Sequence, residues 1–196
     1  IADEVQTGIA RTGRLLATCG NCSCPDKHCS GTPEVKADIL ILGKALSGGA
    51  YPVSAVLAND AIMNVIWPGN HGSTFGGNPL AAAVGIAAPE VIKDEALANN
   101  AQELGDLFRS ELSKFIETSS IVNGVRGKGL LNAILINDTE DSDTAWNICL
   151  RLRDNGLLAK PTHGNIIRFA PPLVMTKDQL LDCVSIITKT LKEFEV

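Results

Sequence analysis

The sequence predicts an α/β protein with two parts. Residues 1–116 read as the C-terminal part of a larger domain built on a mostly parallel sheet, and residues 117–196 read as a small α+β domain. Short continuous apolar runs alternate with helical patterns in the first part, as buried parallel strands and their helices do. The chain has 196 residues, 45% of them hydrophobic and 20% charged, which is the composition of a folded soluble protein.

The first part begins with the end of a buried strand at residues 1–6, followed by a Gly- and Cys-rich loop. The apolar runs 37–42 and 53–57 predict two more strands. Asn78 and Pro79 are a favourable N-cap and first residue for a helix, which Pro89 is expected to interrupt. A further helix is expected to carry one apolar stripe from Leu97 to Phe115.

The second part predicts three strands and two helices. The strands are expected at residues 130–136, 157–160 and 166–170. A helix over 144–154 should end at Gly156, a residue type suited to the position after a helix C-cap. Thr176 and Gln179 have the spacing of a capping box, which predicts the start of a last helix that runs to about Phe194.

Charge and hydropathy exclude several kinds of partner. The net charge is −5 and the isoelectric point is near 5.2, which argues against binding nucleic acid or an anionic membrane. No apolar run approaches the ~20 residues that span a bilayer.

The chain opens at Ile1 without Met and already inside an apolar run, so we expect a fragment. We expect an intracellular location, in the cytoplasm or alternatively in the mitochondrial matrix.

Four of the six cysteines lie close together, in the order Cys19, Cys22, Cys24 and Cys29. With His28 beside them they are weak candidates for a zinc site, because their spacing is not that of a standard finger. We expect instead a solvated insertion loop over residues 18–34 and no metal. The other two, Cys149 and Cys183, lie in apolar helical patterns and are expected to be small core residues.

Two segments at strand ends carry groups suited to catalysis. Ligands of open α/β sheets bind beyond the carboxyl ends of the strands, where Asp3, Glu4 and Gln6 are expected. The alternative for Asp3 is a carboxylate satisfied by loop amides. Lys44 follows the strand 37–42, and partial desolvation there would favour a nucleophilic amine suited to a Schiff base. The alternative is an ordinary lysine at a strand end.

Two further segments carry groups suited to anions. Residues 71–77 place Ser73 and Thr74 among glycines shortly before a helix N-terminus, which suits a phosphate, although a tight turn is the alternative. Arg168 lies among apolar strand residues, where it must bind an anion or form a structural ion pair. An acid, a lysine, two hydroxyls and an arginine together meet the needs of transamination with pyridoxal phosphate.

Several motifs resemble those of class III, fold-type I aminotransferases, and the resemblance covers the chain except for the Cys-rich loop. These motifs are DEVQTG (3–8), GKALSGG (43–49), HGSTFGGNPL (71–80) and VRGKGLL (125–131). Residues 150–164 and 166–173 look most like the members that act on ornithine. Members that act on acetylornithine or 4-aminobutyrate share single motifs and are the alternatives. A non-catalytic truncated or degenerate relative is a further alternative.

The resemblance implies a role for each matching residue. Lys44 would form the Schiff base with pyridoxal 5′-phosphate, and Asp3 would keep the ring nitrogen protonated. Val5 would pack on the ring and Gln6 would bind near its hydroxyl. The phosphate of the partner subunit's cofactor would be bound by Ser73 and Thr74, which implies a homodimer, and Arg168 would hold a carboxylate of glutamate or 2-oxoglutarate. Roughly the first half of the family's chain is absent, so we expect this piece to be inactive alone.

Overall fold

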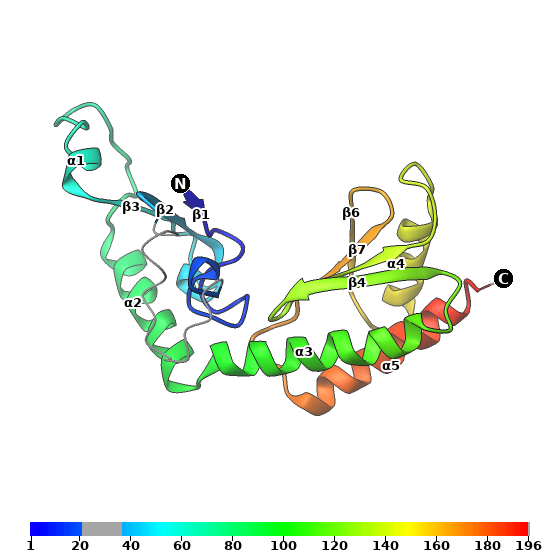
Figure 1. Ribbon diagram of the computed structural model, residues 1–196. Helices are drawn as coiled ribbons and strands as arrows, with labels where there is room; N and C mark the ends of the chain where they lie inside the picture. Colours follow the sequence, from blue (N-terminus) through cyan, green and yellow to red (C-terminus); the bar gives the residue numbers. More distant parts are fainter. Residues whose placement is uncertain (21–36, 196) are drawn as a thin grey trace. The chain divides into compact units, whose positions relative to one another are not determined.

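The computed structural model describes residues 1–20 and 37–195, which form two compact units, Ile1–Ala98 and Asn99–Val196 (Figure 1). The sequence predicted the boundary after residue 116, but the structure divides the chain after Ala98. The reason is helix α3 (Leu97–Ile116), whose apolar stripe belongs to the core of the second unit. Its buried members there are Ala101, Leu104, Phe108 and Leu112.

The first unit holds a three-stranded sheet in the order β1 (Ala2–Asp3), β2 (Ile39–Leu42) and β3 (Ala55–Ala58). The pair β1·β2 is parallel and the pair β2·β3 is antiparallel. The described sheet is therefore mixed, where the sequence predicted a mostly parallel one. The connection from β2 to β3 contains one short 3-10 helix, η3 (Lys44–Ser47), and lacks the crossover helix that a parallel return needs.

Helix α2 (Pro79–Asp94) begins as predicted but does not stop at Pro89. The Asn78 side chain accepts a hydrogen bond from the backbone N–H of Ala81, at 2.9 Å, and caps the helix. Proline removes one backbone donor and crowds the carbonyl four residues earlier, which here belongs to Gly85. The helix nevertheless continues for another turn, to Asp94. The short helices η1 (Ala17–Gly20) and α1 (Asp60–Met63) complete the described first unit.

Replacing Pro89 by alanine is expected to stabilise the first unit. An interior proline costs a helix about 3 kcal/mol relative to alanine, and the substitution restores a backbone donor to α2. We expect slower hydrogen exchange in the peptides that cover residues 79–94 of Pro89→Ala, measured by mass spectrometry. Equal exchange in the two proteins would show that the proline ring is accommodated without cost.

The second unit packs three helices on one antiparallel sheet in the order β4 (Val122–Lys128), β5 (Leu131–Ile136), β7 (Ile166–Phe169) and β6 (Lys160–Thr162). The helices are α3, α4 (Thr144–Asp154) and α5 (Lys177–Lys192). The predicted helix over 144–154 and the capping box of Thr176 and Gln179 are confirmed. The core residues between sheet and helices include Ile134, Ile148, Ile167 and Ile187.

A strand was predicted over 157–160, but β6 begins only at Lys160. The backbone N–H of Leu157 takes part in the hydrogen bonds that end α4 and so does not pair with a neighbouring strand. The Leu157 N–H donates to the Leu152 carbonyl at 2.9 Å, and the Gly156 N–H donates to the Arg153 carbonyl at 3.0 Å. Gly156 has a φ of 89°, so the helix closes with a Schellman motif. Cys149 of α4 is a core residue as predicted, and burial raises the pKa of its thiol to about 11.

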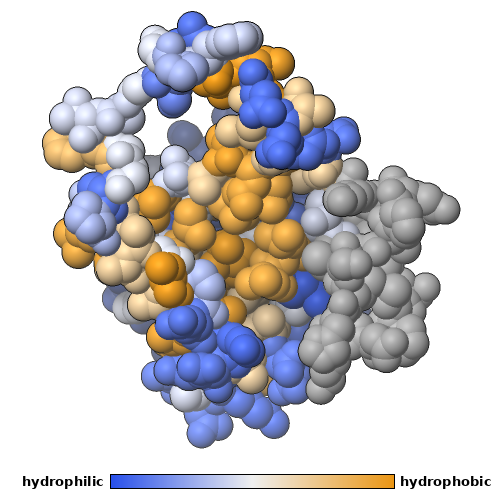
Figure 2. Space-filling model, turned by 90° about the vertical axis from the view of Figure 1, so that its left-hand side faces the viewer, coloured by the Kyte–Doolittle hydropathy of each residue, from blue (hydrophilic) through white to orange (hydrophobic). Residues whose placement is uncertain are grey.

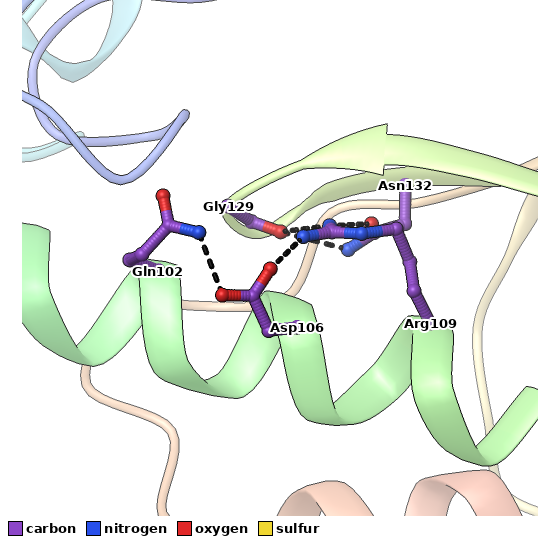
Figure 3. Close-up of polar contacts among 5 residues, drawn as sticks. All are labelled: Gln102, Asp106, Arg109, Gly129 and Asn132. Atoms are coloured by element: carbon purple, nitrogen blue, oxygen red, sulfur yellow. Dashed lines mark hydrogen bonds and ion pairs between the residues drawn. The ribbon is translucent and has the colours of Figure 1, made fainter. Parts of the chain in front are cut away.

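A polar cluster joins α3 to the turn between β4 and β5 (Figure 3). Arg109 donates to the Gly129 carbonyl at 3.2 Å and to the Asn132 side-chain oxygen at 2.7 Å. The buried Asn132 amide donates to the same carbonyl at 3.0 Å, and Asp106 forms an ion pair with Arg109. These contacts hold the backbone of Gly129 against α3.

The first unit exposes many large apolar side chains, and Figure 2 shows apolar surface gathered on the side that faces the viewer. A contiguous apolar surface of this kind is typical of an interaction site. The exposed large apolar side chains of the first unit include Val56, Leu57, Val65, Ile66, Trp67, Leu80 and Ile86.

Among the described residues, no helix combines the length and the apolarity needed to cross a bilayer.

Candidate functional site

The parallel pairing of β1 and β2 brings two predicted site segments to one edge of the sheet. Ala2 pairs with Leu40 and Asp3 pairs with Ile41, so both strands end at the same edge. Gln6 and Lys44 each lie three residues beyond the pair formed by Asp3 and Ile41. The Lys44 Nζ donates to the Gln6 Oε1 at 3.1 Å. The predicted neighbours Gln6 and Lys44 are therefore in direct contact.

Lys44 has a strained backbone conformation. Its φ is 45°, in the left-handed region that non-glycine residues seldom adopt. Strain of this kind is concentrated at functional sites, where the surrounding structure imposes it. The partial desolvation predicted for Lys44 is not provided by the first unit, because the Lys44 side chain is exposed there. Lys44 begins η3, and its amine lies at the sheet edge beside Gln6 rather than among the apolar side chains of β2.

Asp3 and Val5 flank the same edge. The Asp3 side chain is exposed, and its Oδ1 accepts a hydrogen bond from the backbone N–H of Val5 at 3.1 Å. Val5 packs against the junction of β2 and η3, where a Cβ placed on Gly43 would lie 3.4 Å from the Val5 Cγ1. The carboxylate of Asp3 thus has one local donor and open space around it.

Glu4, predicted at the same strand end as Asp3 and Gln6, has a structural role in this region that its sequence context does not reveal. Its side chain is only 2% exposed, and it accepts hydrogen bonds from the Thr7 hydroxyl at 2.7 Å and from the backbone N–H groups of Ala17 and Thr18 at 3.0 and 2.9 Å. Burial alone would raise the pKa of this carboxyl, but the hydrogen bonds together outweigh burial and lower its pKa. Glu4 thereby fixes the loop that follows β1.

The backbone of Glu4 is held as firmly as its side chain. The Glu4 N–H donates to the Ile41 carbonyl and the Glu4 carbonyl accepts from the Gly8 N–H, both at 2.9 Å. A side chain on Gly8 would place its Cβ 2.8 Å from that carbonyl oxygen, so only glycine fits this close turn. Glu4 therefore locks the backbone between Asp3 and Gln6.

The predicted phosphate ligands lie in the exposed loop before α2. The Ser73 hydroxyl accepts a hydrogen bond from the backbone N–H of Gly76 at 3.1 Å, and Thr74 is exposed. This contact is local, and among the described residues it does not join Ser73 to Lys44 or Gln6. The tight turn that was the alternative interpretation is thus present, and the phosphate role stays a prediction.

Arg168 lies on β7 in the second unit and is half-buried. The pairing of β7 places it opposite Ala133 of β5 and Lys160 of β6. Its predicted role toward a carboxylate stays a prediction.

Of the four predicted zinc candidates, Cys19 lies in the described part of the chain, in the 3-10 helix η1. Cys22, Cys24, His28 and Cys29 lie outside the described residues, and so does most of the predicted insertion loop over 18–34. In the part of the chain that the structure does describe, no group of three or more His, Cys, Asp or Glu side chains is arranged to hold a metal ion.

Comparison with known proteins places this chain among the transaminases. The family model for class-III aminotransferases matches residues 1–191. The mitochondrial ornithine aminotransferase of Rattus norvegicus is 58% identical over 194 residues, covering 99% of this chain and 41% of the relative. The chain thus spans about two fifths of the length of the curated relatives it matches, less than the predicted half.

Solved structures agree on the fold. The acetylornithine aminotransferase of Elizabethkingia anophelis is 66% identical, with a TM-score of 0.86 over 97% of this chain and 45% of that one. The Plasmodium falciparum ornithine delta-aminotransferase is 48% identical, with a TM-score of 0.86 over 98% of this chain and 46% of that one. The Toxoplasma gondii ornithine aminotransferase, at 43% identity and a TM-score of 0.85 over 97% of this chain and 42% of that one, has been described with pyridoxal phosphate at partial occupancy in its active site. This chain belongs to the class-III aminotransferases of fold-type I.

Proposed function

We propose that this chain provides the cofactor lysine of an ornithine aminotransferase that uses pyridoxal 5′-phosphate. The observation that carries the proposal is the contact between the Lys44 amine and Gln6 at the carboxyl edge of β1 and β2. The proposed reaction converts L-ornithine and a 2-oxo acid to L-glutamate 5-semialdehyde and an L-amino acid. Ornithine aminotransferases at 48–58% identity support it, and this chain covers about two fifths of their length.

The residues at this edge fit the cofactor chemically. When bound, pyridoxal phosphate supplies an aldehyde that combines with amines and a ring that withdraws electrons. Lys44 offers an exposed amine in a strained backbone, which holds its Nζ at the sheet edge. Asp3 offers an exposed carboxylate that can hold a proton on a ring nitrogen, because an anion beside a pyridinium favours its charged form. Val5 offers an apolar side chain between Asp3 and Gln6 for the face of a ring.

The remaining roles concern anions and a second subunit. Ser73 and Thr74 are proposed to bind the phosphate of a partner subunit's cofactor in a homodimer, which is supported by their exposure ahead of the N-terminus of α2. Arg168 is proposed to bind a substrate carboxylate such as that of 2-oxoglutarate. The named mitochondrial relatives support the mitochondrial alternative for location.

Covalent labelling of Lys44 tests the proposal without a need for turnover. The chain is incubated with pyridoxal phosphate, reduced with borohydride to make the bond to the amine permanent, and digested for mass spectrometry. We expect the label on the Lys44 peptide at least tenfold above the mean of the other lysine peptides, because among the described residues this amine is the one that contacts Gln6 at the carboxyl edge of β1 and β2. In Lys44→Ala the selective label should disappear.

The matched control is Lys93→Ala, which removes another lysine of the first unit, in the last turn of α2. It should keep the label on Lys44. Equal labelling of all lysines, or selective label in Lys44→Ala, would contradict the assignment of Lys44. It would favour the alternative of a non-catalytic relative.

A second candidate substrate has a specific observation in its favour, the 66% identity to an acetylornithine aminotransferase. Two hybrids separate the candidates: this chain replaces the matched segment of the Rattus norvegicus relative in one and of the Elizabethkingia anophelis relative in the other. If the chain sets the preference, both hybrids will favour the same substrate among ornithine, N-acetylornithine and 4-aminobutyrate. A preference that follows the host would place the specificity outside this chain.

A further inference from the structure

The 3-10 helix η3 carries Lys44 between two points that are held by neighbouring side chains. The first is Gly43, a buried residue with an extended backbone at a φ of −175°. A Cβ on Gly43 would lie 3.4 Å from the Val5 Cγ1 and 3.6 Å from the Ser54 Cβ, so these two side chains confine it. The chain then turns at once into the left-handed conformation of Lys44, with a φ of 45°.

The second point is Ser47, the last residue of η3, which is only 2% exposed. Its hydroxyl donates a hydrogen bond to the Tyr51 carbonyl and accepts one from the Tyr51 N–H at 3.3 Å. A serine hydroxyl can serve as donor and acceptor at once. The bridge spans Gly48 and Gly49, which have φ values of 61° and 85° and no side chain to restrain them. Ser47 thus closes the loop that follows η3.

Helix η3 has little stability of its own. It is one turn long, and its backbone hydrogen bonds join residues three apart: the N–H groups of Leu46 and Gly48 donate to the carbonyls of Gly43 and Ala45, at 3.0 and 2.9 Å. Short 3-10 turns have poor hydrogen-bond geometry and lack the cooperativity of longer helices. A left-handed non-glycine residue persists only where the surrounding structure imposes it. The backbone of Lys44 therefore depends on contacts outside η3, and the bridge from Ser47 to Tyr51 is one of them.

We propose that Ser47 is a positioning residue that holds the Lys44 amine at the carboxyl edge of β1 and β2. Without the hydroxyl, the two glycines after Ser47 are free to change conformation, and η3 unwinds from its C-terminal end. Lys44 then adopts a commoner backbone conformation, and its Nζ moves away from the Gln6 Oε1, which it contacts at 3.1 Å. The inference rests on the function proposed for Lys44 and adds a residue that acts through it.

Two aldehydes separate the position of the Lys44 amine from its accessibility. Pyridoxal phosphate depends on a site around the amine, whereas formaldehyde needs only an exposed amine, which Lys44 has. Both labels are fixed by hydride reduction and measured on the Lys44 peptide by mass spectrometry. In Ser47→Ala we expect the ratio of pyridoxal phosphate label to formaldehyde label to fall at least tenfold, because the amine is no longer held in place. The formaldehyde label itself should not change.

Two further variants identify the hydroxyl as the cause. Ser54→Ala makes the same change at an exposed serine of the same unit and keeps the Cβ beside Gly43. It should leave the label ratio unchanged. Ser47→Thr keeps a hydroxyl at the buried position and should hold the ratio within threefold of that of the unaltered chain. A ratio as low in Ser47→Thr as in Ser47→Ala would assign the loss to packing around residue 47 and overturn the inference.

Hydrogen exchange separates positioning from a general loss of stability. In Ser47→Ala we expect faster exchange in the peptides that cover residues 43–51, and unchanged exchange in those that cover residues 1–18 and 79–94. Faster exchange in all three segments would show that Ser47 stabilises the whole unit, and the positioning role would be wrong. An unchanged label ratio in Ser47→Ala, or an equal loss in Ser54→Ala, would also overturn it.

The function proposed for Lys44 can fail separately. If pyridoxal phosphate does not label Lys44 selectively in the unaltered chain, that function is removed, and this inference with it. If the selective label is present there and persists in Ser47→Ala, only the positioning role of Ser47 is removed.

Discussion

Gly105→Ala is expected to destabilise the second unit more than any other single-methyl change in its helices. A Cβ on Gly105 would lie 1.9 Å from the carbonyl oxygen of Gly129 and 2.4 Å from its carbonyl carbon. Both are backbone atoms, and the carbonyl is further held by Arg109 and Asn132 (Figure 3). The added methyl must therefore displace either α3 or the turn between β4 and β5.

The expected cost is about 3 kcal/mol, at the upper end of the range for overpacked cores. Hydrogen exchange of the α3 and β5 peptides, measured by mass spectrometry across a urea series, gives the free energy of unfolding of this unit. The matched control is Gly85→Ala, which adds the same methyl to the interior of α2, where a Cβ would meet no atom within 4 Å apart from its chain neighbours and the backbone of its own helix. It should stabilise its helix by about 0.5–1 kcal/mol.

The same substitution is expected to lower the free energy of unfolding at Gly105 and to raise it at Gly85. The test therefore depends on the sign of each change and not on its absolute size. If Gly105→Ala unfolds at the same urea concentration as the unaltered chain, the close approach of α3 to Gly129 is absent in solution. If both variants are stabilised, helix propensity alone decides and the packing argument fails.

Features that depend on local sequence were predicted well. The caps at Asn78 and Thr176 and the helix over 144–154 each follow from residues within a few positions of one another. Pro89 was predicted to interrupt α2, but it lies inside the helix, because an interior proline can kink a helix instead of ending it. The boundary between the units was predicted too far toward the C-terminus. An apolar stripe shows that a helix is buried, but it does not show which of two cores the helix joins.

Features that depend on strand pairing were out of reach of the sequence. The antiparallel return of β3 and the contact of Lys44 with Gln6 both require a register between distant segments. The predicted group of Asp3, Gln6 and Lys44 does share one edge. The carboxylate satisfied by loop amides, which was the alternative for Asp3, is instead its neighbour Glu4, because alternation along the strand turns Glu4 inward.

Glu4→Gln is expected to loosen the segment that carries Asp3 and Gln6. Glutamine keeps the size of the side chain but loses its charge and one acceptor, so one of the backbone donors of Ala17 and Thr18 is left without a partner. An unsatisfied buried donor costs about 2 kcal/mol. We expect faster hydrogen exchange in the peptides that cover residues 1–18, and a matching loss of selective label on Lys44. Glu90→Gln, which alters an exposed glutamate on α2, should change neither.

The same carboxylate predicts a pH dependence with a definite sign. The hydrogen bonds hold the pKa of folded Glu4 below the ordinary glutamate value of 4.5. The contribution of Glu4 to the stability of the first unit is therefore complete well above pH 4.5, and it is lost as the pH falls through the lower folded-state pKa. Protection of residues 1–18, corrected for intrinsic exchange rates, should fall over that interval in the unaltered chain and in Glu90→Gln. In Glu4→Gln it should already be low at neutral pH and fall less. A parallel decline in all three proteins would assign the acid sensitivity to other carboxylates and leave Glu4 without the positioning role.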